Sequence, residues 1–385
     1  MWPINRPHTT SSADGKHDAR RAFTQSSGSL RVLSLGLSRG LSLGLSVMVY
    51  ALRRCLKAIP IMFCAAVLTF VIVRLLPGDP AAQLVSGMAA TPQGLNTMRH
   101  QLGVDISIPQ QLMRYLLALV QGNWGRSFVT GEPVRTALMQ RLPATLELTL
   151  CAVVLTVLSG IPLGATAALY PGRWPDRFCL FVTSASASLP SFFIGLGLIY
   201  VFYFRLGWAP EPIGRLNALL VAPPIHTGFL LIDALRDHDG ASWRDALAHL
   251  ALPACTLTAF GIAPLARTTR SALLASLDSD AVRTAKSLGL PFRTVFLSYA
   301  LAPAAPALVI SMGMIASYMV GASVAVEKVF AWPGMGSYAL DALASADYAP
   351  LQGFILSVAI IFTVLNLLID LCLMALDPRV RLRNR

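Results

Sequence analysis

Apolar residues along the chain gather in six long runs, and the segments between them carry most of the charged and turn-forming residues. Each run holds about 20 residues or more, and a helix of about 20 apolar residues crosses the roughly 30 Å hydrocarbon core of a bilayer. The pattern therefore predicts an all-α, polytopic membrane protein with six transmembrane helices. The predicted spans lie near residues 57–76, 143–170, 178–204, 247–267, 299–321 and 353–376.

Basic residues cluster beside these runs, before the first span and after every second one. Cytoplasmic loops of membrane proteins carry an excess of Lys and Arg. The side that carries the clusters is therefore predicted to be cytoplasmic, together with both termini. The clusters are Arg53, Arg54 and Lys57; Arg173 and Arg177; Arg267, Arg270, Arg283, Lys286 and Arg293; and Arg379, Arg381, Arg383 and Arg385.

Composition supports a lipid bilayer as the surroundings of the chain. Hydrophobic residues make up 55% of the 385 and charged residues only 13%, which is too little polar surface for a soluble domain of this length. The net charge of +12 would suggest a nucleic-acid partner if it lay on one polar face. Because the basic residues flank apolar runs instead, no nucleic-acid partner is expected.

The first 47 residues differ from the rest, being rich in Ser, Arg and Gly with a repetitive LSLGLSRGLSLGLS run. Such a segment has little to bury, so it is expected to be disordered or to lie before the true start of translation. Met48 begins a basic flank followed by an apolar run, as expected of an uncleaved first helix. Residues 48–385 are accordingly predicted to form the transmembrane domain.

A charged segment, DSDAVRTAKSLGLPFRTVFLSYALA, separates the fourth and fifth spans. Ser279 or Asp280 can cap a helix over 281–288, and Gly289 followed by Pro291 ends it. A helix of about two turns is marginal alone, so it needs something to hold it. The segment is predicted to dock into another protein.

The faces of this short helix suggest what it could contact. Ala281, Ala285 and Leu288 are predicted to share one side that is small enough to enter a cleft, while Arg283 and Lys286 could pair with acidic groups around that cleft. The alternative is a solvated or interfacial helix that only joins two spans.

Two further features concern the opposite side of the membrane and the span interior. The run EKVFAWPGMG places Phe330 and Trp332 beside Pro333, Gly334 and Gly336, which predicts an ordered turn; a plain aromatic anchor at the membrane interface is the alternative. A charged carboxylate inside a membrane span, such as that of Glu147, is energetically unfavourable. The helix dipole at the start of the second span is expected to favour the negative charge there. Proton coupling through Glu147 is the sharper alternative.

Seven segments in order resemble the inner-membrane permease subunits of dipeptide, oligopeptide and nickel ABC importers. They span about six-sevenths of the chain, so the resemblance is specific. The segments are RLLPGDPA (74–81), GNWGRSFVTGEPV (122–134), RLPATLEL (141–148), SLPSFFIGL (188–196), HLALPACTL (249–257), VEKVFAWPGMG (326–336) and LDPRVRL (376–382).

The resemblance implies a type I ABC importer permease fold in the bacterial cytoplasmic (inner) membrane. The charged segment, as part of a cytoplasmic loop over 269–298, would be the helix that couples to the ATPase. Asp280 stands where the family has a glutamate, and Ala281 stands where this branch usually has an aromatic residue. The implied coupling residues are Asp280, Ala281, Arg283, Ala285, Lys286 and Gly289, and the implied outer-mouth residues are Phe330, Trp332, Pro333, Gly334 and Gly336.

The resemblance also implies partners and cargo. The partners would be a second, similar permease, two ATPase subunits and an extracytoplasmic substrate-binding protein. ATP and Mg²⁺ would bind the ATPase subunits, with no cofactor on this chain. Di- and oligopeptides are the expected cargo, with nickel, glutathione or another small solute as alternatives.

Rival classes find less support in the residues. None of the lysines stands in a complete phosphate-binding loop, and no HExxH, GxSxG or paired-carboxylate pattern appears, so a non-catalytic subunit is expected. A secondary transporter or channel should show inverted repeats or several carboxylates at mid-membrane, and neither is evident.

Overall fold

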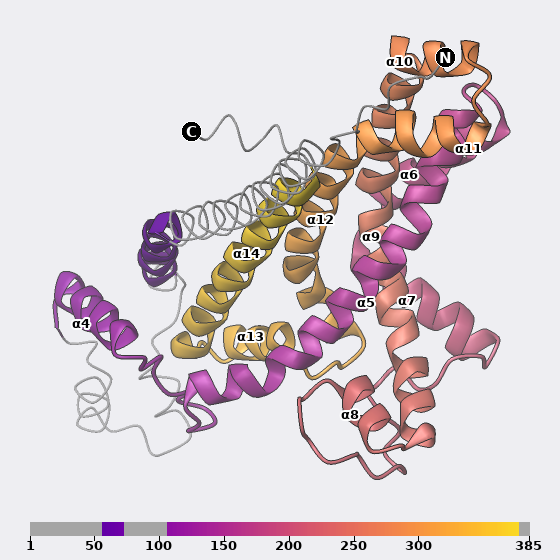
Figure 1. The fold of residues 1–385 in the computed structure, drawn as a ribbon. Coiled ribbons are helices and arrows are strands. Elements are labelled where there is room, and N and C mark those ends of the chain that lie inside the picture. Colours follow the sequence, from indigo (N-terminus) through magenta and orange to yellow (C-terminus); the bar gives the residue numbers. More distant parts are fainter. Residues whose placement is uncertain (1–55, 73–105, 377–385) are drawn as a thin grey trace, which may run out of the picture. The chain divides into compact units, whose positions relative to one another are not determined.

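The computed structural model describes residues 56–72 and 106–376, with the side chains of residues 375 and 376 excepted (Figure 1). The chain divides into two units, Met1–Ala58 and Ile59–Arg385, and apart from residues 56–58 the account below concerns the second. The predicted N-terminal extension, Met48, the segment 74–81 and the C-terminal arginines lie outside the described residues.

The described part of the chain is helical, with no strand among its elements. An apolar helix, Leu56–Ile72, comes first. The labelled helices that follow are α4 (Ile108–Val120), α5 (Val134–Leu169), α6 (Trp174–Ser188), α7 (Ser191–Leu198), η1 (Ile199–Arg205), α8 (Leu230–Arg236), α9 (Gly240–Leu277), α10 (Asp280–Ser287), α11 (Phe292–Thr294), η2 (Val295–Leu301), α12 (Ala302–Val329), α13 (Met335–Ala344) and α14 (Tyr348–Leu376).

Four helical segments in the described residues are long and apolar enough to cross a membrane: Val134–Leu169, Gly240–Leu277, Phe292–Val329 and Tyr348–Met374. A bent pair, α6 with α7 and η1, would make a fifth if it counts as one span. The 17-residue helix Leu56–Ile72 covers most of the first predicted span, whose last residues lie outside the described part. The all-α prediction is confirmed, whereas six complete spans are not.

The third predicted span is not one straight helix. The chain turns by 104° between α6 and the helix formed by α7 and η1. Leu189 is extended at φ −106° and ψ 133°, and Pro190 follows it. Proline disfavours a helical conformation in the residue before it and has no N–H to donate, so the bend falls at this pair. The apolar run 178–204 hid the bend because hydropathy does not register backbone geometry.

Other predicted boundaries fell short of the true helices. α5 begins at Val134, so Pro143 lies inside the helix rather than at its start. α9 continues to Leu277, so the first residues of the loop predicted over 269–298 are still helical. Apolar length marks only the part of a helix within hydrocarbon, and a helix can continue into the polar region with arginine among its residues.

The packing of α5 against α9 depends on two glycines one turn apart. A Cβ atom at Gly164 would lie 2.4 Å from the carbonyl oxygen of Ala266 and 2.7 Å from Cβ of Thr269. At Gly160 it would lie 3.2 Å from a methyl carbon of Leu265. Small residues four apart let two membrane helices approach with their backbones nearly in contact. The two glycines therefore set the spacing of this helix pair.

The two segments singled out from the sequence lie at opposite ends of α12 (Figure 1). α10 and α11 precede α12, and α13 follows it at the other end. With 28 residues, α12 is about 42 Å long. A contact at one end can therefore reach the other only through the helices between them.

Candidate functional site

The charged segment folds as the short helix α10, held at both ends by local interactions. Ser279 is the N-cap, and its Oγ accepts a hydrogen bond from the N–H of Val282 at 3.4 Å. Gly289 adopts φ +71°, and the N–H of Leu290 donates to the carbonyl of Ala285 at 3.2 Å. A left-handed glycine after the last turn is a common helix end. The predicted helix, its cap and its stop are confirmed.

The inner face of α10 packs on its own chain. Val282 and Ala285 are buried in a cluster with Leu273 of α9 and Ala168 of α5. Residues of η2 and the start of α12 complete the cluster, which we call the α10 cluster: Ala168, Leu273, Val282, Ala285, Val295, Ala300 and Ala304. α10 therefore packs against η2, and through this cluster it is linked to α5, α9 and α12.

This packing corrects the predicted contact face. Ala285 is 2% exposed, so it cannot share a free side with Ala281 and Leu288, which are exposed. The sequence showed a helical face but not that the chain itself would cover it. Arg283 pairs with Asp278 at 2.8 Å and approaches Asp280 at 3.8 Å, all three being exposed. Lys286 is exposed as well.

At the other end of α12, the turn over 330–336 is ordered and largely buried. Phe330 is 2% exposed and Trp332 is 1% exposed, both within the main apolar core. The Trp332 indole N–H donates to the carbonyl of Ala144 at 3.0 Å. The predicted ordered turn is confirmed, but an exposed aromatic anchor is ruled out for these two rings. Of the five outer-mouth candidates only Pro333 is exposed, and Gly334 and Gly336 are buried.

Beneath this turn lies a carboxylate that sequence reasoning did not single out. Glu327 has no exposed surface, and its Oε2 accepts hydrogen bonds from the N–H groups of Gly336 at 2.7 Å and Ser337 at 3.0 Å. Its Oε1 accepts from Thr145 of α5 at 2.7 Å and from Ser323 at 3.2 Å. An acid just before an aromatic, proline and glycine-rich turn was the available signal, since such a turn exposes backbone N–H groups.

Glu147 has a partner that the sequence did not indicate. Its carboxylate accepts a hydrogen bond from the guanidinium of Arg215 and, at 2.8 Å, one from the N–H of Leu231. It lies well inside α5 rather than in the first turn, so the predicted helix-dipole explanation is wrong. The Arg215 guanidinium also lies 5.9 Å from the centre of the Trp332 ring. Glu147 thus ties α8 and the loop before it to the first half of α5.

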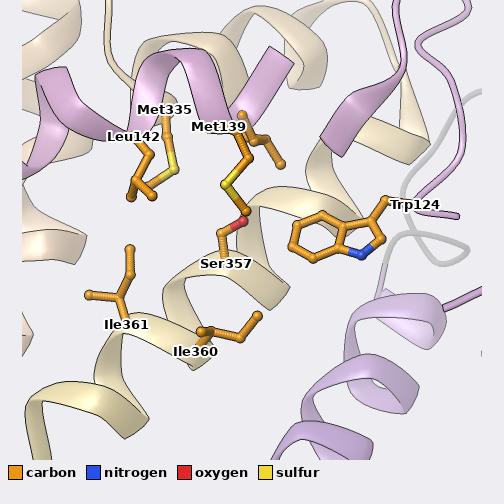
Figure 2. Close-up of a pocket in the computed structure, with 8 residues that line it drawn as sticks. Trp124, Met139, Leu142, Met335, Ser357, Ile360 and Ile361 are labelled. Carbon is orange, nitrogen blue, oxygen red and sulfur yellow. The ribbon is translucent and has the colours of Figure 1, made fainter. Parts of the chain in front are cut away.

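Next to the same end of α5 lies a small, half-open apolar cavity of about 60 Å³ (Figure 2). It lies between α5, the first residue of α13 and α14. Met335 connects the cavity to the turn over 330–336, because it belongs to both. The N–H of Met335 donates to Thr145 at 2.9 Å. The lining residues are Trp124, Leu138, Met139, Leu142, Met335, Ser357, Ile360 and Ile361.

Asp233 of α8 organises the loop that rests on α5. Burial acts to raise its pKa, but hydrogen bonds from the side chain and N–H of Thr227, and from the N–H groups of Gly228 and His226, bring the pKa below its ordinary value. Ionised Asp233 therefore stabilises the loop above the ordinary aspartate pKa of about 3.9. That contribution is lost as the pH falls through the lower pKa of the folded form.

We accordingly expect the loop over 226–229 to become open to pepsin as the pH falls below about 3.9, with cleavage mapped by mass spectrometry. In Asp233→Asn the same site should be cut at higher pH too, because the amide cannot accept all of these hydrogen bonds. Equal protection of the wild-type loop on both sides of that pH would contradict the assignment.

Comparisons with known proteins cover nearly all of the chain after residue 46. Residues 160–382 match the family described as "Binding-protein-dependent transport system inner membrane component", and residues 47–149 match the N-terminal domain of such membrane components. The Probable D,D-dipeptide transport system permease protein DdpB of Escherichia coli (strain K12) is 38% identical over 328 residues, which are 85% of this chain and 96% of the relative.

Two further relatives align over a similar length. The Di/tripeptide transport system permease protein DppB of Pseudomonas aeruginosa (strain UCBPP-PA14) is 38% identical over 86% of this chain and 97% of its own. The Glutathione transport system permease protein GsiC of Escherichia coli (strain K12) is 34% identical over 86% of this chain and 98% of its own. The chain therefore belongs to the family of binding-protein-dependent transport system inner membrane components, as an ABC importer permease related to the peptide permeases.

Proposed function

We propose that this chain is the membrane-spanning subunit through which di- and oligopeptides are imported at the expense of ATP bound to a separate ATPase. The named relatives support peptides as cargo, because two of them are dipeptide or di/tripeptide permeases that match over almost their whole length. Glutathione, itself a small peptide-like solute, is the second candidate, supported by a relative at 34% identity.

One observation carries the proposed mechanism: α10 is a short, capped helix that is exposed on one face and anchored on the other. Its exposed residues include Asp280, Ala281, Arg283 and Lys286, which could meet a cleft on an ATPase subunit. Its buried Val282 and Ala285 belong to the α10 cluster, which includes residues of α5, α9, η2 and α12. A partner that moves α10 would therefore move the membrane helices with it.

The basic residues near α10 favour a cytoplasmic position for this end of the bundle. Asp176 at the start of α6 accepts hydrogen bonds from Arg270 at 2.6 and 2.9 Å, so two of the basic clusters lie together there. Clustered arginines beside apolar spans favour the cytoplasmic face. In this arrangement both termini are cytoplasmic, and the turn over 330–336 faces outward.

The full assembly in this proposal contains a second, similar permease, two ATPase subunits and an extracytoplasmic substrate-binding protein. ATP binding would close the ATPase pair and draw the two α10 helices together, which would open the pathway outward. Hydrolysis would then reset it. Mg²⁺ and ATP belong to the ATPase subunits.

The proposal is tested by purifying the tagged chain from gently solubilised membranes with whatever accompanies it, and by reconstituting that complex in proteoliposomes. We expect an ATPase, a second permease and a binding protein to co-purify, and radiolabelled dialanine to accumulate only when ATP is supplied to the ATPase side. Accumulation of glutathione or Ni²⁺ in place of dialanine would reassign the cargo. Recovery of the chain alone as a homo-oligomer would favour a channel or secondary transporter.

A further inference from the structure

The buried carboxylate of Glu327 joins three helices at the outer end of the bundle. It belongs to α12 and accepts a hydrogen bond from Thr145 of α5. It also accepts hydrogen bonds from the N–H groups of Gly336 and Ser337 in the first turn of α13. The first N–H groups of a helix have no partner within that helix. Glu327 therefore satisfies the start of α13 and binds that start to α5.

The directions of these hydrogen bonds follow from the backbone. The N–H of Met335 can only donate, so the Thr145 hydroxyl accepts it at 2.9 Å. The hydroxyl proton is then free to be donated to Oε1 of Glu327. The Thr145 hydroxyl of α5 thus connects the N–H of Met335 in α13 to the carboxylate of Glu327 in α12. Replacing Thr145 or Glu327 leaves a buried backbone N–H without its present acceptor.

Close packing leaves this joint little freedom to shift. A Cβ atom at Gly334 would lie 2.3 Å from the carboxyl carbon of Glu327, and one at Gly336 would lie 2.7 Å from the Cα of Val324. The turn is therefore pressed directly against the carboxylate and the backbone of α12. Trp332 adds its indole bond to Ala144 of α5.

The same two helices also meet at the α10 end. Ala168 of α5 and Ala304 of α12 both belong to the α10 cluster. Twenty-three residues separate Ala168 from Thr145, and twenty-three separate Ala304 from Glu327, which is about 35 Å in each helix. α5 and α12 thus form a frame that is closed by the α10 cluster at one end and by Glu327 at the other.

We propose that Glu327 is a positioning residue of the import cycle, which makes the outer ends of α5, α12 and α13 move as one body when α10 is displaced. This inference rests on the proposed import function. With the joint intact, displacement of α10 reaches Met335 and the cavity that it lines; with the joint loosened, the two long helices move separately and the outer opening no longer follows ATP turnover.

The test uses the reconstituted complex with its ATPase subunits and binding protein, and measures dialanine uptake and ATP hydrolysis per assembled complex. Glu327→Gln keeps the size of the side chain but presents an N–H₂ group to at least one donor. Thr145→Val keeps the shape and removes the hydroxyl. We expect each variant to lower uptake per ATP hydrolysed by about ten-fold, within the range of coupling free energies, with ATP hydrolysis changed less than about two-fold.

The two substitutions should also fail to add, because they break the same joint: Thr145→Val with Glu327→Gln is expected to be no worse than Glu327→Gln alone. Lys328→Gln is the matched control, since it changes the neighbouring residue, whose side chain is exposed and pairs with exposed Asp341. That variant should transport normally. Ser323→Ala should have a small effect, because Glu327 keeps three other donors.

Three results would overturn the inference. One is normal uptake per ATP in a folded Glu327→Gln complex. The second is a parallel fall of uptake, hydrolysis and yield of assembled complex, which would indicate a purely structural role. The third is full additivity of the two substitutions. Absence of dialanine uptake by the wild-type complex would instead count against the proposed function, so the two failures can be told apart.

Discussion

Replacing Gly289 with valine is expected to abolish peptide uptake while the chain remains inserted in the membrane. Gly289 ends α10 at φ +71°, and a Cβ there would meet no atom within 4 Å. The substitution therefore acts through the backbone alone. A β-branched residue in the left-handed region costs roughly 1–3 kcal/mol, and it can relieve that strain by unwinding the last turn of the helix.

α10 has little stability with which to resist that strain. It has only 8 residues, and so short a helix depends on its caps and on tertiary contacts. Unwinding would break the bond from Leu290 to the carbonyl of Ala285 and displace the exposed side chains of Arg283 and Lys286. In the proposed mechanism these side chains belong to the surface that meets the ATPase. Coupling to the ATPase is therefore lost while the membrane helices stay folded.

The measurement is dialanine uptake by proteoliposomes, together with the amount of ATPase that co-purifies with the variant. Gly207→Val is the matched control, because Gly207 follows η1 at φ +62° and also has nothing within 4 Å of an added Cβ. It carries the same kind of strain at a turn far from α10 in the chain. Normal uptake by Gly289→Val at a normal level of inserted protein would count heavily against α10 as the coupling helix.

The features that the sequence predicted well are those with local causes. Apolar length placed α12 and α14, and the cap at Ser279 with the stop at Gly289 placed α10, because both signals act within a few residues. The bend at Leu189 and Pro190 had a local cause as well. It was missed because an unbroken apolar run appeared to explain the same residues.

The features that the sequence did not reveal depend on partners far away in the chain. Thr145 and Glu327 are 182 residues apart, and Glu147 and Arg215 are 68 apart, so no periodicity could have paired them. Helical spacing likewise put Ala285 on a face but could not show that this face would be buried in a cluster that includes Leu273 and Ala168. Of these positions the sequence singled out Glu147 and Ala285, and only the fold assigned their contacts.

Replacing Gly164 with valine is expected to prevent correct folding rather than to uncouple transport. A Cβ at this position would lie 2.4 Å from a backbone oxygen of α9 and 3.1 Å from the backbone nitrogen of Arg270. Backbone atoms cannot rotate away as a side chain can, so α5 and α9 would have to separate. Overpacking typically costs 1–3 kcal/mol, and we expect about 3 kcal/mol or more here because the obstacle is backbone.

The separation would spread from this contact to both candidate sites. α5 carries Ala168 of the α10 cluster and Thr145, which donates a hydrogen bond to Glu327, while α9 carries Leu273 of the α10 cluster. A fall in thermal unfolding temperature and in the yield of monodisperse protein in detergent is the measured outcome. Gly321→Val is the matched control, since this glycine lies within α12 and an added Cβ would meet nothing within 4 Å. If both variants keep the wild-type unfolding temperature, α5 and α9 are not in backbone contact at Gly164, and the frame that links α10 to Glu327 loses its central support.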